Sequence, residues 1–377
     1  MRTSVFLFRP AVGVRETFHS IDVLRGLAAI SILVFHYFHF TMGHGAVALP
    51  AERLDEVPLL RGLRWIRDHG SLAVQLFWVI SGFVFMNVYA GHEPTARTFF
   101  VNRLARLYPL HLLTLLLVAA IQAASLGMSG HFLIYEANSV GNFILNLFFA
   151  SAWLDAGHLS FNGPVWSISV EVLVYFLFWA YVRLCRPSLF SAGAAFLIFF
   201  ALSAVTHNMV MLCGAFFFAG SSAYALFMLV PAEARGKALL AAAAFFLPWS
   251  VALLSGHVDR LPLTIRLLGL FVPALLVLAL SEVMGLRSLY RRFRVVGDVT
   301  YSTYMWHTPL QMIFLLGAGL GLYPIAVVLS NGFFLAYLLF VILFAYASYR
   351  LIERPAQAWV RGRLLRTRRP LRAIAAP

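Results

Sequence analysis

The stretch from Ser20 to Phe40, SIDVLRGLAAISILVFHYFHF, is an apolar run that carries two ionisable side chains, Arg25 and His36. They are eleven residues apart, about three turns of an α-helix, so one continuous helix would place both on the same face. Arg25 would lie near one membrane surface and His36 near the middle of the roughly 30 Å core. An ionisable group at that depth is costly and marks a functional candidate, here a general base or a nucleophile. The alternative is structural: Arg25 snorkels to the surface and His36 bonds a neighbouring helix.

A carboxylate in a second apolar run matches His36 in depth. Glu171 and Tyr175, in the segment GPVWSISVEVLVYF, are four residues apart and share a helical face. Counted along both helices, Glu171 and His36 reach a similar depth. A pair between them would orient the imidazole and raise its basicity. A purely structural bridge between two helices is the alternative.

Two further motifs have both a binding and a structural interpretation. Arg103 and Arg106, in FFVNRLARLYPLH, lie on one helical face at the cytoplasmic mouth of a span. They are either a fork for phosphate groups or simple topology anchors. Ser81 and Gly82, in LFWVISGFVF, lie at mid-membrane. They either let helices pack closely, or Gly82 lets a ligand approach while the Ser81 hydroxyl lines its path.

The segment GDVTYSTYMWHTPL places Tyr301, Tyr304 and His307 in the cytoplasmic half of another span. Tyr304 and His307 share a face by their spacing. The tyrosines fit an interfacial aromatic belt, whereas His307 is equally compatible with packing and with function. Glu353, in YRLIERPAQ near the end of the chain, is interpreted as an inner-surface charge.

The composition predicts the fold class. Hydrophobic residues make up 61% of the chain and charged residues 12%, against about 45–50% and about 25% in soluble domains. We therefore predict an all-α integral membrane protein that does not bind nucleic acid, since its net charge of +14 lies in loops and tails where it sets topology. Neither the histidines nor the cysteines have the spacing of metal ligands, so no metal is expected.

Ten apolar runs are long enough to cross a bilayer, and two shorter amphipathic or apolar pieces, 59–67 and 143–153, are expected to lie at the surface or re-enter the membrane. Most of the 29 lysines and arginines fall in alternate loops and at both ends, which predicts cytoplasmic termini. We divide the chain into a cytoplasmic segment 1–19, a transmembrane domain 20–356 and a basic cytoplasmic tail 357–377, for which attraction to anionic lipid is sufficient. The predicted spans are 22–42, 71–90, 107–126, 165–184, 189–205, 209–230, 238–256, 264–284, 301–320 and 324–348.

Six of these motifs, taken in order, resemble the acyltransferase-3 family of bacterial membrane O-acyltransferases. They are ID-x-LRGLAA with Arg25-x10-His36, FWVISGF, FFVNRLARLYP, WSISVEVLVYF, GDVTYSTYMWHTPL and IERP. The resemblance implies ten core spans in the bacterial plasma (inner) membrane. It implies transfer of an acyl group, usually acetyl, from cytoplasmic acyl-CoA to a sugar hydroxyl of a surface or exported polysaccharide or its lipid-linked precursor. No bound cofactor is implied, and partners would come from polysaccharide biosynthesis.

The resemblance also assigns roles. It makes His36, in the family's Arg-x10-His pair with Arg25, the expected catalytic residue and places Arg103 and Arg106 near the donor. Our hypothesis adds Glu171 as the group that sets His36 and Arg25 as a further donor-binding residue. The remaining motif residues are expected to line the site: Ser81, Gly82, Tyr175, Tyr301, Tyr304, His307 and Glu353. The alternative from another functional class is a transporter or flippase for a glycan or small solute, with the buried ionisable residues lining a pathway.

Overall fold

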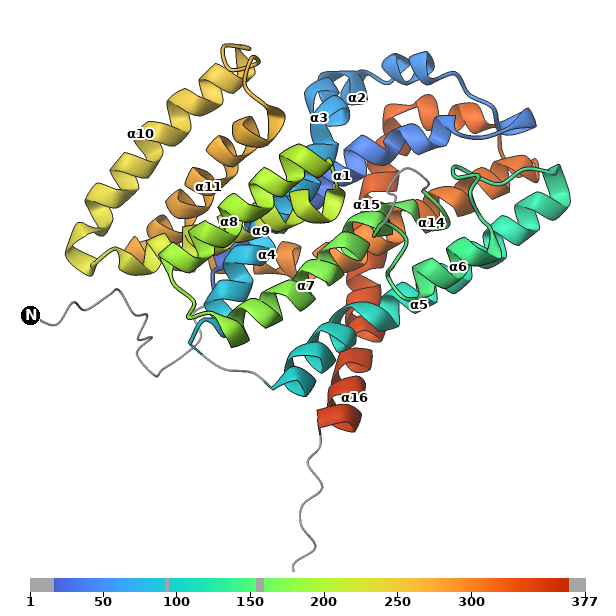
Figure 1. The fold of residues 1–377 in the computed structure, drawn as a ribbon. Coiled ribbons are helices and arrows are strands. Elements are labelled where there is room, and N and C mark those ends of the chain that lie inside the picture. Colours follow the sequence, from blue (N-terminus) through green and yellow to red (C-terminus); the bar gives the residue numbers. More distant parts are fainter. Residues whose placement is uncertain (1–16, 92–94, 154–158, 366–377) are drawn as a thin grey trace, which may run out of the picture.

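The computed structural model describes residues 17–91, 95–153 and 159–365. The described chain is a bundle of long helices without strands, as Figure 1 shows, so the predicted all-α membrane fold is confirmed. Nine helices in the described ranges are long and apolar enough to span a membrane. Most of the predicted segment 1–19 and the end of the predicted tail lie outside the described residues. The long helices are α1 (His19–Phe35), α4 (Ala73–Tyr89), α5 (Ala96–Ser129), α7 (Trp166–Leu184), α8 (Leu189–Thr206), α9 (Met209–Leu229), α10 (Arg235–Leu254), α11 (Leu263–Ser281), α14 (Thr300–Gly319), α15 (Asn331–Ser348) and α16 (Arg354–Leu365).

Helix α14 is the predicted span 301–320, and it is absent from the nine apolar helices. Its first half carries tyrosine, serine, threonine and histidine side chains, which make it too polar for that criterion. Most of its residues are nevertheless buried, because α1, α5 and α15 pack around it. A helix this polar is sheltered from lipid by its neighbours, and this places its functional groups inside the bundle.

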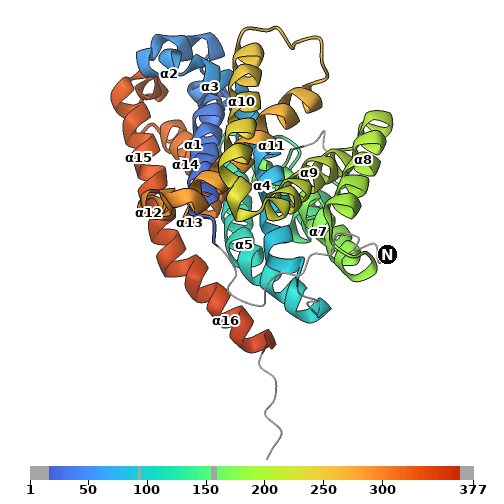
Figure 2. The same cartoon turned by 90° about the vertical axis from the view of Figure 1, so that its left-hand side faces the viewer.

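Three predicted spans differ from the structure at their ends. Helix α1 stops at Phe35 and continues as a 3₁₀ turn, His36–Thr41, so the prediction of one straight helix through His36 is wrong. Helix α5 begins well before the predicted residue 107. Helix α15 begins at Asn331 rather than 324, and a π-helical segment, Tyr349–Glu353, joins it to α16. Figure 2 shows α16 in red, running on from α15 and passing close to α5.

The loop before α4 contains two short helices, α2 (Pro58–Gly62) and α3 (Arg64–His69), where one amphipathic helix is predicted. Its arginines are partly neutralised by acidic neighbours. Arg67 pairs with Asp55 at 2.6 Å and Arg64 pairs with Asp68 at 3.4 Å. With a cytoplasmic N-terminus this loop lies on the outer side, where few lysines and arginines are expected. The ion pairs lower its net positive charge. The short apolar piece after α5 is α6 (Val140–Leu147), and two more short helices, α12 (Arg287–Arg292) and α13 (Arg294–Asp298), precede α14.

Helices α4 and α9 touch through their backbones at two glycines. A Cβ atom on Gly82 would lie 1.7 Å from the carbonyl oxygen of Phe217, and one on Gly220 would lie 1.8 Å from that of Val79. The Ser221 hydroxyl also donates to the carbonyl of Gly82 at 3.1 Å. This is close packing of small residues. Gly82 therefore faces α9, which corrects its expected place in the site lining.

Candidate active site

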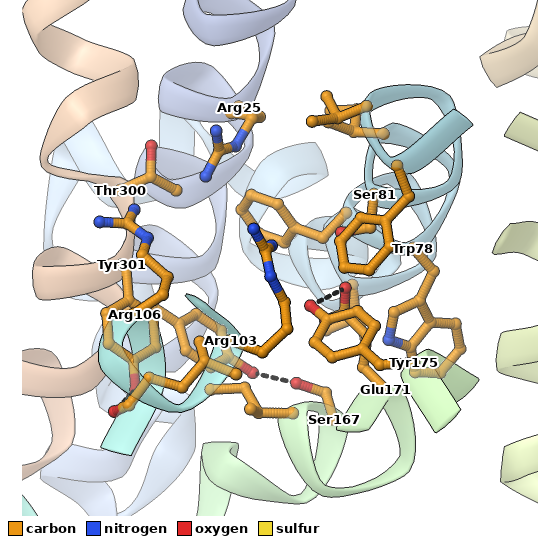
Figure 3. A pocket seen from close by; sticks show the side chains of 18 of the residues that line it. Arg25, Trp78, Ser81, Arg103, Arg106, Ser167, Glu171, Tyr175, Thr300 and Tyr301 are labelled. Atoms are coloured by element: carbon orange, nitrogen blue, oxygen red, sulfur yellow. Dashed lines mark hydrogen bonds between the residues drawn. The ribbon is translucent and has the colours of Figure 1, made fainter. Parts of the chain in front are cut away.

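A cavity of ≈ 210 Å³ opens between α1, α4, α5, α7, α14 and α16. We call it the arginine pocket because four arginines line it: Arg25, Arg103, Arg106 and Arg361. Figure 3 shows the side chains of Arg103 and Arg106, both from α5, near that of Arg25 from α1. The other polar lining residues include predicted ones, namely Ser81, Glu171, Tyr175, Tyr301 and Tyr304.

The arginines differ in what neutralises them. Arg106 forms an ion pair with Glu353 and lies 5.6 Å from the centre of the Tyr301 ring. Arg25 contacts Asp22 at 3.5 Å. Arg103 lies 4.8 Å above the Phe85 ring, and its buried Nε has no hydrogen-bond partner among the described residues. The buried Nε of Arg103 is therefore a donor that is left for a ligand.

Glu171, from α7, lines the same pocket. Its Oε1 accepts a hydrogen bond from Tyr175 at 2.8 Å, and Ser81 also bonds to the carboxylate. Arg25 and Arg103 are close enough to interact with its charge. Glu171 thus offsets part of the positive charge of the pocket. The hypothesis that it pairs with His36 is not supported, because within the described chain its hydrogen-bond partners are Tyr175 and Ser81.

Three imidazoles meet in a second group, which we call the histidine cluster: His36, His39 and His307. The ring centre of His36 lies 4.7 Å from that of His39 and 4.8 Å from that of His307. His39 and His307 are buried, whereas His36 keeps partial exposure. The described residues contain no group of three His, Cys, Asp or Glu side chains arranged to hold a metal ion. A neutral imidazole can both accept and donate a proton, so the cluster contains groups capable of proton transfer.

The hydrogen bonds of the cluster define which nitrogens carry hydrogen. The Gln311 amide donates through Nε2 to the carbonyl oxygen of His36 at 2.7 Å, so its Oε1 faces Nδ1 of His39 at 2.8 Å. Nδ1 of His39 therefore donates, and its Nε2 accepts from the Tyr135 hydroxyl at 3.0 Å. Tyr135 lies in the loop after α5, and burial raises the pKa of its hydroxyl, which keeps it a donor.

His36 itself is left with one available nitrogen. Its Nδ1 lies 3.1 Å from the carbonyl oxygen of Ile32, which can only accept, so this nitrogen donates. In the neutral ring Nε2 then carries a lone pair, the form that a general base or nucleophile requires. His307 also has a buried Nε2 without a partner in the described chain.

Tyr304 stands between the arginine pocket and the histidine cluster. It lines the pocket, and its ring centre lies 5.7 Å from that of His307. Its hydroxyl donates to the carbonyl of Pro164 at 2.7 Å, and the Ser167 hydroxyl lies 2.7 Å away. The Tyr304 side chain therefore lies between the arginine pocket and the histidine cluster. Tyr304 and His307 share a helical face, as their spacing predicts.

Four residues of these groups are missing from the sequence interpretation: His39, Tyr135, Gln311 and Arg361. His39 and Gln311 had a usable signal, since they follow His36 and His307 by three and four residues. Tyr135 lies in a loop and has no such signal. Arg361 was counted with the basic tail.

Comparison with known proteins supports an enzymatic site. Residues 18–350 match a family model described as an acyltransferase domain. A curated relative, the acyltransferase MdmB of Streptomyces mycarofaciens, is 32% identical over 124 residues, which cover 31% of this chain and 30% of the relative. The chain thus aligns with less than a third of that relative's length. No solved structure matches the chain.

Proposed function

The chain belongs to the acyltransferase-3 family, and from this premise we propose that it transfers an acyl group, acetyl in the simplest case, from acyl-CoA to a hydroxyl group of a carbohydrate. The acceptor class is a surface or exported polysaccharide or its lipid-linked precursor. The protein is a membrane acyltransferase, and the transporter interpretation is set aside because the family match describes a catalytic domain. We place it in a bacterial inner membrane with both termini in the cytoplasm, working beside polysaccharide-synthesis proteins.

The observation that carries the proposal is the partly unneutralised arginine pocket beside the histidine cluster. CoA carries a pyrophosphate and a further phosphate, and guanidinium groups bind phosphates with paired hydrogen bonds. Arg103 has a free donor and Arg25 lies in the same pocket. The phosphates would bind there, and the uncharged thioester arm would extend past Tyr304 toward His36.

The reaction then requires one proton carrier. In direct transfer, Nε2 of His36 takes the proton of the acceptor hydroxyl as its oxygen attacks the thioester carbonyl carbon. The carbon–sulfur bond breaks, and the leaving thiolate takes the proton back from the imidazolium. In a covalent route, the same Nε2 attacks the thioester carbonyl carbon, and the carbon–sulfur bond breaks to release the CoA thiolate. The acceptor oxygen then attacks the acyl carbon, the nitrogen–carbon bond breaks, and the hydroxyl proton goes to the thiolate. Both routes need the lone pair that the contact with Ile32 directs to Nε2.

The test is transfer of radiolabelled acetyl from acetyl-CoA to a crude cell-glycan extract by the purified protein in lipid. Wild type should label the glycan, and His36→Ala should lower the rate by about 10²–10⁴-fold. His257→Ala is a matched control, because His257 is exposed in the loop after α10. Equal transfer by His36→Ala and wild type would exclude His36 as the base. Acetyl-CoA hydrolysis by wild type without any glycan labelling would contradict the acceptor class.

A further inference from the structure

The C-terminal helix α16 supplies part of the wall of the arginine pocket. Arg361 lines the pocket together with Arg103 and Arg106 of α5. The sequence interpretation gave the segment after 356 only a lipid-attracting role. Attraction to lipid does not explain why an arginine of this helix lines a cavity together with residues of α1, α4, α5, α7 and α14.

Contacts at the start of α16 hold the helix in place. Glu353, immediately before α16, pairs with Arg106 and accepts from the Ser302 hydroxyl at 2.6 Å. Gln357, one turn into α16, donates to the same carboxylate at 3.0 Å. The Glu353 side chain is 2% exposed, so this junction is buried. The direction in which α16 leaves the bundle is therefore determined by α5 and α14.

The body of α16 also rests on α5. Trp359, Val360 and Leu364 of α16 line an apolar groove together with Leu104, Tyr108 and Pro109 of α5. Arg363 lines this groove and lies 5.7 Å from the centre of the Trp359 ring. Arg361 is two residues away and so points to a different side. The helix thus presents Arg361 to the pocket and Arg363 to the groove.

The charges around Arg361 leave the pocket positive. Glu353 is already engaged by Arg106, and Glu171 is bonded by Tyr175 and Ser81. No carboxylate in the described ranges forms an ion pair with Arg361 or Arg103. Like charges gathered in a partly desolvated cavity repel one another, and a bound polyanion removes that cost.

We propose that α16 is a donor-binding element and that Arg361 contacts a phosphate group of the acyl-CoA donor at the mouth of the pocket. This inference rests on the proposed function, since it takes the same pocket to be the donor site. The first part of the segment 357–377, predicted as a tail that is attracted to lipid, would then form part of the donor site. The reacting thioester lies away from Arg361, so the residue affects donor affinity and leaves the chemical step unchanged.

The experiment measures the dissociation constant for CoA and the KM and kcat for acetyl-CoA. Wild type, Arg361→Ala, Arg361→Lys and the matched control Arg363→Ala are compared in bilayers of zwitterionic lipid, which remove attraction to anionic lipid. We expect Arg361→Ala to weaken CoA binding and raise KM by about tenfold, the value of one charge-assisted hydrogen bond. Arg361→Lys should lose about threefold, because it keeps the charge without the fork. kcat should not change.

The outcomes separate this inference from the proposed function. Tight CoA binding by wild type with unchanged binding by Arg361→Ala overturns the role of α16 and leaves the proposed function standing. Equal losses in Arg361→Ala and Arg363→Ala would show a general charge effect and also overturn it. If wild type binds no CoA, both proposals fall together. Thermal unfolding of each variant checks that α16 stays packed.

Discussion

The side-chain amide of Gln311 in α14 donates to the main-chain carbonyl of His36 at 2.7 Å, across 275 positions of the chain. The bond is made where α1 changes from an α-helix to a 3₁₀ turn. It joins the residue with the available imidazole nitrogen to the helix that carries Tyr304 and His307. The geometry of the histidine cluster therefore depends on neighbours that hold the imidazoles in place, such as Gln311.

Tyr135→Phe tests that dependence. The change removes the donor to Nε2 of His39 and leaves a buried nitrogen unsatisfied. We expect kcat for acyl transfer to fall by about tenfold with KM for acyl-CoA unchanged, since a displaced His39 loosens Gln311 and His36. Tyr323→Phe is the matched control, because Tyr323 bonds the carbonyl of Phe314 at 2.6 Å outside the cluster. A rise in KM with kcat preserved would contradict the positioning role.

The same tyrosine gives a pH dependence of stability. Burial raises the pKa of Tyr135 above its usual value, so the folded state retains this proton at a pH where the unfolded chain has lost it. The stabilising contribution of the hydroxyl is complete below about pH 10 and declines as pH rises further. The difference in melting temperature between wild type and Tyr135→Phe should therefore shrink above about pH 10. A melting-temperature difference that grows with pH would contradict a raised pKa of Tyr135 in the folded state.

Arg103→Ala tests the donor site. The Nε of Arg103 is buried without a partner, so its loss removes a ligand contact and breaks no described hydrogen bond. We expect KM for acyl-CoA to rise by about 10–100-fold, because hydrogen bonds to charged groups contribute about 1.5–3 kcal/mol. Arg97→Ala on the same helix is the control, as Arg97 is exposed and outside the pocket. The idea fails if both variants keep the KM of wild type.

Glu353→Gln tests the junction between α15, α16 and α5. The change leaves Arg106 without its buried counter-charge, and breaking a buried ion pair costs about 3–5 kcal/mol. We expect a clear loss of thermal stability in detergent. Glu136→Gln should cost less than about 1 kcal/mol, since its pair with His44 is exposed. Equal melting temperatures for Glu353→Gln and wild type would show that the pair does not hold α16.

Gly82→Ala tests the packing of α4 on α9. The added methyl would overlap the carbonyl oxygen of Phe217, which is backbone and cannot rotate away. The helices must separate, at a cost of about 1–3 kcal/mol or more. Gly193→Ala in α8 is the control, because a Cβ there meets nothing within 4 Å. It should be neutral or slightly stabilising, as alanine favours helix. Equal melting temperatures for Gly82→Ala and Gly193→Ala would contradict close backbone contact between α4 and α9.

Hydropathy predicted most of the long helices and did not predict the site. Apolar runs of about twenty residues predict spans, and the helices around Glu171 and His307 lie where they are expected. The change to a 3₁₀ helix after Phe35 was missed; its first carbonyl, that of His36, is bonded by Gln311, which is far away in sequence. The depth of a residue in the membrane does not specify how its helix is rotated or which helices lie beside it. Equal depth therefore wrongly suggested a pair between Glu171 and His36. Tyr135 sits in a loop, where no periodicity marks which side chains turn inward.

The polarity of α14 also bears on how the protein is made. A segment with this many hydroxyl and imidazole groups partitions poorly into lipid as a separate helix. Its burial among α1, α5 and α15 means that these helices have to be present before it can settle in the membrane. We expect α14 to insert poorly when expressed as an isolated segment and well within the whole chain, which a glycosylation-site insertion assay would measure. The helix that carries Tyr304, His307 and Gln311 would thus be the last to become stable during biogenesis.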